Sequence, residues 1–108
     1  MLARDSNDNN NSQVPLIIYH QINTLDPIAM RRWGVSHLVA GETFLMFFVK
    51  TSAPKTKIIV EYHPYPDSYK LTLGRITDGY FWEVMDEKED IFCDQLVEII
   101  DLMIKSNL

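Results

Sequence analysis

Residues 57–76, KIIVEYHPYPDSYKLTLGRI, decide the fold of this chain. Apolar and polar side chains alternate in residues 57–63 and again in residues 69–74. This period of two predicts two β-strands, each with one well-buried face. Pro64, Pro66 and Asp67 stand between the two runs, because a paired ladder does not tolerate such residues. The stretch therefore predicts a β-hairpin.

Further strands are predicted on both sides of this hairpin. Residues 43–50 are apolar at both alternating sets of positions, which predicts a strand that is covered on both faces. Residues 35–40 favour a short strand. Residues 80–85 predict a short aromatic strand after the turn signal at residues 77–79.

Helices are predicted towards both ends of the chain. Ile18, Ile22 and Leu25 recur at helical spacing with Pro15 in the first turn, although the run of β-branched residues 17–18 also suits a strand. A short helix after Asp26 is predicted to end near residue 30. From residue 91 onward the apolar positions recur every three or four residues, which predicts an amphipathic helix with Asp90 as its cap.

Together these elements predict a small α+β protein. The sheet is expected to be an antiparallel meander of three to four strands, with an N-terminal and a C-terminal helix packed on it. Residues 1–12 are rich in Asn, Asp and Ser and predict a disordered leader, and residues 13–108 predict a single domain.

Charge is distributed unevenly in this chain, which has 108 residues and a net charge of −5. Residues 27–76 carry seven basic and three acidic side chains, whereas residues 77–108 carry two basic and nine acidic ones. The acidic last third is unfavourable for general nucleic-acid binding, because phosphate contacts dominate such affinity. The basic middle segment leaves nucleic-acid binding open as an alternative.

Metal, disulfide and membrane chemistry receive little support from the sequence. Cys93 is the single cysteine, so an intrachain disulfide is excluded and a buried structural thiol in a reducing compartment is expected. His20, His37 and His63 lack the spacing of metal ligands, and no cofactor is expected. The longest apolar run, residues 44–49, is too short to span a bilayer, and no signal segment is recognised. We expect a cytoplasmic protein without membrane contact.

Four segments of the chain resemble a group of small proteins encoded by bacterial phages and other mobile elements. These segments are residues 44–49, 57–62, 67–76 and 92–96. The shared features are a helix–sheet–helix plan, an Asp-x-Tyr strand start at Asp67 running to Gly74-Arg75-Ile76, and an aromatic-x-Asp-x-Leu helix start at Phe92. The chain departs from the group in its turn at residues 64–66 and its Asn-rich leader. The resemblance implies a protein that works inside a bacterial cell on host machinery or host defence, and it implies no catalytic residue.

His63 and Asp67 are the one pair in the sequence that suggests catalysis. His63 as a general base oriented by Asp67 is one interpretation. A solvated turn, in which Asp67 caps its own backbone, is the other and is favoured, because no nucleophile or oxyanion donor is signalled. We therefore expect no catalytic residues and no enzyme activity.

Arg31, Arg32 and Trp33 carry the alternative of a nucleic-acid-binding module. Two cations beside an aromatic ring are the groups that grip phosphate and stack on a base, with further cations from the basic sheet. The competing interpretation places Trp33 at the edge of the core, with the arginines solvated or paired with the acidic last third.

The leading hypothesis is a non-enzymatic protein that binds and occludes a host protein. Aromatic side chains exceed what a small core needs, and Tyr and Trp are enriched at protein interfaces. The expected partner-binding residues are the aromatic pair and the acidic run, namely Tyr80, Trp82, Asp86, Glu87, Glu89 and Asp90. A homodimer is also expected as one way to cover both faces of residues 44–49.

Overall fold

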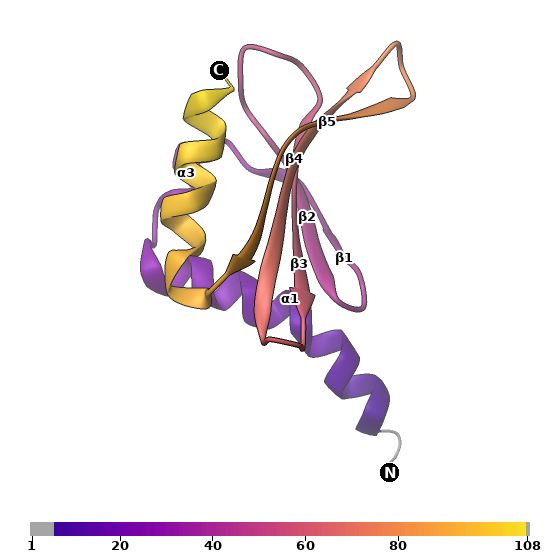
Figure 1. Cartoon of the computed structure of the whole chain (residues 1–108), viewed down its shortest axis with the longest axis vertical. Coiled ribbons are helices and arrows are strands. Elements are labelled where there is room, and N and C mark those ends of the chain that lie inside the picture. The colour runs from indigo at the N-terminus through magenta and orange to yellow at the C-terminus, as the bar shows by residue number, and fades with distance from the viewer. Residues whose placement is uncertain (1–5, 108) are drawn as a thin grey trace.

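The computed structural model describes the backbone of residues 6–107 and the side chains of residues 13–107 (Figure 1). Two helices precede a sheet of five strands, and a helix follows it. The elements in chain order are α1 (Ser6–Leu25), α2 (Ala29–Trp33), β1 (Ser36–Ala40), β2 (Phe44–Val49), β3 (Thr56–His63), β4 (Ser68–Thr77), β5 (Phe81–Ile91), a 3₁₀ turn (Cys93–Gln95) and α3 (Leu96–Ser106).

The sheet is a meander in which every strand pairs antiparallel with its neighbour in the chain, in the order β1-β2-β3-β4-β5. The α+β class and the antiparallel meander are confirmed, as is the hairpin of residues 57–76, which forms β3 and β4. The prediction of three to four strands is wrong, because the sheet has five.

The acidic run forms part of the sheet. Residues 86–90 lie in β5, whereas the sequence predicts that they lead into the last helix. Ile91 ends the strand opposite Tyr69 and is buried. The last helix begins at Leu96, and the backbone N–H of Phe92 donates to Gln95 Oε1, so Asp90 is not its cap. An edge strand in contact with solvent can carry charged side chains at successive positions, so it shows no alternation of apolar and polar residues. The sequence pattern therefore does not predict this strand.

Helix α1 begins earlier than predicted. It starts at Ser6, so Pro15 lies inside the helix and not in its first turn. The helical interpretation of residues 18–25 is confirmed, and the alternative strand is wrong. The predicted leader, residues 1–12, falls partly outside the described residues, since residues 1–5 are not described and the backbone of residues 6–12 belongs to α1.

Both long helices lie on one side of the sheet (Figure 1). α1 packs against β1 and β2, and α3 packs against β4 and β5. The core between the two layers is apolar, and Trp33 stacks on Phe47 with ring centroids 6.3 Å apart and planes 4° apart. The fully buried members of the core include Ile18, Ile22, Phe47, Ile58, Val60, Leu71, Leu73, Leu96 and Ile100. Burying such side chains contributes most of the favourable free energy of folding.

Strand β2 shows that the two faces of the sheet differ. Leu45, Phe47 and Val49 are buried against the helices, whereas residues 44, 46 and 48 alternate with them and are half-buried. The prediction that both faces of this strand are covered is therefore wrong for the described residues. No described helix is long and apolar enough to cross a membrane.

Candidate functional site

The second face of the sheet, opposite the helices, carries a mixed apolar and charged surface that we call the open face. Strand pairing brings side chains from four strands into rows, with Met46 beside Ile59 and Ile59 beside Thr72. The open face includes Phe44, Met46, Phe48, Lys57, Ile59, Glu61, Lys70, Thr72, Gly74, Ile76, Trp82, Val84 and Glu87. Apolar surface that none of the described helices covers is typical of an interaction site.

The Trp82 ring lies over Gly74 on the open face. A Cβ at Gly74 would come within 2.4 Å of the Trp82 ring, so the glycine makes room for the indole. The Lys57 ammonium lies 5.1 Å from the centroid of Phe48 and 6.0 Å from that of Trp82. A cation held over two aromatic faces is attracted to both rings. Trp82 is still 41% exposed, so it remains available to a partner.

The β4–β5 hairpin ends in an aromatic tip. Figure 1 shows that this hairpin projects beyond the body of the protein. Tyr80 is 82% exposed and Phe81 is 61% exposed, and their ring centroids lie 5.4 Å apart. Two of the predicted partner-binding residues, Tyr80 and Trp82, therefore lie near each other at the end of one hairpin, with Phe81 between them.

The acidic residues predicted to bind a partner lie along β5 but do not share one face. Asp86 is paired with Leu73, on the helix-covered side, and lies 3.7 Å from the Lys88 ammonium. Glu87 is paired with Thr72, on the open face, and lies 3.7 Å from the Lys70 ammonium. Glu89 and Asp90 are exposed. These side chains form an acidic strand edge rather than a single patch.

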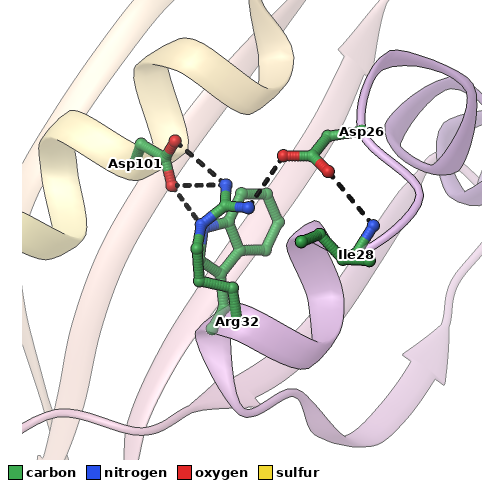
Figure 2. Close-up of polar contacts among 5 residues, drawn as sticks. Asp26, Ile28, Arg32 and Asp101 are labelled. Atoms are coloured by element: carbon green, nitrogen blue, oxygen red, sulfur yellow. Dashed lines mark hydrogen bonds and ion pairs between the residues drawn. The ribbon is translucent and has the colours of Figure 1, made fainter.

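The three residues of the predicted nucleic-acid site do not form such a site. Trp33 is 3% exposed, and its Nε1–H donates to Asp101 Oδ1 at 2.6 Å, so the ring is not available to stack on a base. Arg32 donates to both carboxylate oxygens of Asp101 at 3.1 Å and to Asp26 at 2.8 Å, as Figure 2 shows. Arg31 is exposed. The interpretation that Trp33 belongs to the core, with an arginine paired to the acidic last third, agrees with this geometry.

The Arg32 network also changes the acidity of Asp26. Hydrogen bonds from the Arg32 side chain and from the backbone N–H of Ile28 lower the pKa of Asp26 below its ordinary value of 3.8 (Figure 2). A lowered pKa in the folded state stabilises the fold above the unfolded pKa, and this contribution is lost as the pH falls through the lowered value. Because Arg32 belongs to α2 and Asp101 to α3, their hydrogen bonds form a structural clamp between these two helices.

His63 and Asp67 do not meet. The Tyr62 hydroxyl donates to Asp67 Oδ1 at 2.5 Å, whereas His63 Nε2 lies 3.5 Å from Glu61 Oε1. The bond from Tyr62 to Asp67 raises the pKa of Tyr62. A histidine general base oriented by Asp67 therefore has no support in this geometry. Among the described residues, no group of three His, Cys, Asp or Glu side chains is placed to hold a metal ion.

A small cavity of about 260 Å³ lies between α1 and the β3–β4 hairpin, lined by Val14, Ile17, Gln21, Tyr62, Asp67 and Tyr69. The buried Tyr69 hydroxyl donates to Gln21 Oε1 at 2.7 Å. Burial raises the pKa of Tyr69 to about 12 from its ordinary value of 10.0. Tyr62 and Asp67, which share the hydrogen bond described above, also lie in the walls of this cavity.

The raised pKa of Tyr69 predicts a specific loss of stability in alkali. Because the folded-state pKa exceeds the unfolded one, the contribution of Tyr69 is complete below pH 10 and is lost as the pH rises through about 12. Tyr69→Phe should lose less stability than the wild type between about pH 8 and about pH 11, measured by urea denaturation. Tyr65→Phe, at a position that is 92% exposed, is the control and should behave as the wild type does. Equal alkaline losses in the wild type and Tyr69→Phe would contradict this assignment.

Cys93 lies in the 3₁₀ turn before α3 and is exposed, so the prediction of a buried thiol is wrong. The apolar positions of the last helix begin only at Leu96, and Cys93 precedes them.

Several residues of the open face were not predicted as site residues. Lys57, Ile59 and Glu61 belong to the predicted hairpin, and their positions alternate with the buried Ile58 and Val60. That alternation is the sequence signal that assigns them to the opposite face.

Comparison of the chain with protein-family models, with curated proteins and with solved structures gives no match, so its function has to be inferred from this geometry.

Proposed function

We propose that this chain is a small non-enzymatic protein that binds and occludes a protein of a bacterial host cell. The observation that carries the proposal is the projecting β4–β5 hairpin, whose tip exposes Tyr80 and Phe81 with Trp82 beside them. Large exposed aromatic side chains cost free energy in water and are the commonest anchors of protein interfaces. The resemblance to phage and mobile-element proteins supports an origin in such an element and action in the bacterial cytoplasm, on host machinery or a defence component.

The chemistry of the hairpin suggests which surface the partner offers. The aromatic tip fits an apolar pocket, and Glu89 and Asp90 are exposed at the far end of the same strand. Such a strand favours a partner that carries basic residues away from that pocket, where the far end of the strand lies, because complementary charge speeds association and selects the partner. The acidic edge is unfavourable for nucleic acid, which carries the same charge.

The test starts by capturing a stoichiometric protein from a bacterial lysate and then uses that protein in purified form. Tyr80→Ala is expected to weaken binding by about 10- to 100-fold, the range found when a central aromatic anchor is removed. Charge reversal at Glu89 and Asp90 is expected to slow association and to reduce its dependence on salt. Isothermal titration calorimetry and stopped-flow kinetics measure the two effects.

Tyr65→Ala is the matched control, because Tyr65 is also an exposed tyrosine in a hairpin turn but lies at the opposite end of β4. It should bind as tightly as the wild type. Loss of affinity in Tyr65→Ala equal to that in Tyr80→Ala, or full affinity in Tyr80→Ala, would contradict the assignment of the hairpin tip. Failure to recover any stoichiometric protein would count against the function itself.

A further inference from the structure

The open face has a charge pattern that matches a second copy of itself. β3 is the central strand of the five, and on this face it presents Lys57, Ile59 and Glu61 in succession. Lys57 and Glu61 thus lie two positions to either side of Ile59, and the Glu61 side chain is 45% exposed. The neighbouring side chains on β2 are apolar, with Phe48 beside Lys57, Met46 beside Ile59 and Phe44 beside Glu61. Lys70 stands beside Glu61 on β4 and pairs with Glu87 of β5 at 3.7 Å. On β2 and β3 the middle of the open face is apolar, with Lys57 at one end and Glu61 at the other.

We infer that two copies of this chain form a symmetric dimer by packing their open faces together. Two sheets in face-to-face contact lie about 10 Å apart with strand directions within about 30° of each other. A two-fold axis that crosses the strands at Ile59 makes the two β3 strands antiparallel. Ile59 then faces Ile59 of the second copy, and Lys57 faces Glu61 of the second copy. Symmetry forms this ion pair twice.

The same two-fold axis also brings together the apolar side chains of β2 from the two copies. Phe44 of one copy faces Phe48 of the other, and Met46 faces Met46. A two-fold axis parallel to the strands would instead place Lys57 on Lys57 and Glu61 on Glu61, which like-charge repulsion opposes. In the antiparallel arrangement Glu87, in the row of Ile59 and Thr72, faces Glu87 of the second copy, but each is paired with its own Lys70. The charges of β3 therefore favour the antiparallel arrangement.

The two edges of the sheet are less suited to self-association than its open face. The pairing of β1 is irregular between Ser36 and Val39, and His37 in this segment has a φ of 54°. Such a bulge interrupts the edge ladder that a further strand would need. The β5 edge carries the acidic side chains described above, which repel their own copies.

The dimer leaves Tyr80 and Phe81 of the hairpin tip free, whereas Trp82 lies on the open face. Thr56, the first residue of β3, pairs with Arg75, so Tyr80 and Phe81 lie beyond the end of the central strand. The inference goes beyond the proposed function and does not rest on it. It is tested on the purified chain alone, so either can fail without the other.

A charge exchange between two variants tests this arrangement. In Lys57→Glu, each of the two symmetric pairs places two carboxylates opposite each other. In Glu61→Lys, each pair places two ammonium groups opposite each other. Each variant is expected to dimerise at least about tenfold more weakly than the wild type. An equimolar mixture of the two should form a heterodimer, and the double variant Lys57→Glu/Glu61→Lys should recover the homodimer. Sedimentation velocity with a reducing agent present, which prevents disulfides through the exposed Cys93, measures each species.

Lys105→Glu is the control, because it makes the same change of charge at an exposed position on α3, in the helix layer. It should dimerise as the wild type does. A wild type that remains monomeric up to about 1 mM would overturn the inference. A dimer that neither single variant weakens, or a mixture of the two that stays monomeric while circular dichroism shows both folded, would also overturn it.

Discussion

Phe47→Ala is expected to lower the free energy of unfolding by about 3–5 kcal/mol, the range for truncation of a buried phenylalanine. Phe47 has no exposed surface, and its ring stacks on Trp33 in the layer between the sheet and the helices. Its removal leaves a cavity that the surrounding side chains fill incompletely, and it deprives Trp33 of its stacking partner. Urea denaturation followed by far-ultraviolet circular dichroism measures the change.

Phe48→Ala is the matched control for this prediction. Phe48 is the next residue of the same strand, has the same side chain, and points to the open face, where it is half-buried. Its truncation should cost about 1 kcal/mol, because a smaller area leaves water and no closed cavity forms. Measurement at about 1 μM keeps a weak dimer dissociated. Equal losses in the two variants would contradict a helix layer on one side of the sheet.

Asp101→Ala should be the second most damaging change, with an expected loss of about 2–4 kcal/mol. The Asp101 carboxylate accepts the indole N–H of the buried Trp33 and two hydrogen bonds from Arg32 Nη2. Without it, the Trp33 donor is left buried and unsatisfied, which costs more than the net value of the bond itself. The ion pair with Arg32 adds less, because Arg32 is 40% exposed.

Two further variants separate these contributions. Asp101→Asn keeps an oxygen that accepts the indole N–H but removes the charge, so its loss of stability should be smaller than that of Asp101→Ala. Glu98→Ala, in the first turn of α3 at an exposed position, should change stability by less than about 0.5 kcal/mol. Thermal and urea unfolding measure all three. A loss in Asp101→Ala no greater than in Glu98→Ala would show that the clamp contributes nothing.

The sequence is a good guide to the parts of this fold in which one face of an element is buried. Ile58, Val60, Leu71 and Leu73 alternate with polar residues, and β3 and β4 are found where that alternation occurs. α3 follows the three- and four-residue spacing of Leu96, Ile100 and Met103. These elements are predictable because only every second residue of a strand, or every third or fourth residue of a helix, reaches the buried face and has to be apolar.

The rest of the fold depends on contacts that no local pattern reports. Residues 86–90 are charged whether they precede a helix or pair with β4, and the pairing is decided by the register of the neighbouring strand. In the sequence, Trp33 and Arg32 are equally compatible with a nucleic-acid surface and with a clamp. The residue that decides between the two, Asp101, lies 68 positions from Trp33 and 69 from Arg32 in the chain. Tyr80 and Trp82 were predicted as site residues, whereas the open face around Ile59 emerges only when four strands are aligned.

The meander topology implies an order of folding events. Each strand pairs with its immediate neighbour in the chain, so the sheet assembles through short loops with little entropy of closure. The clamp between α2 and α3 joins residues before the first strand to a residue after the last strand, so its formation closes a far longer loop. We therefore expect hairpin contacts to be present in the rate-limiting state for folding, and contacts of Asp101 to form after it. Mutations in β3 and β4 would then slow refolding, whereas Asp101→Ala would chiefly hasten unfolding.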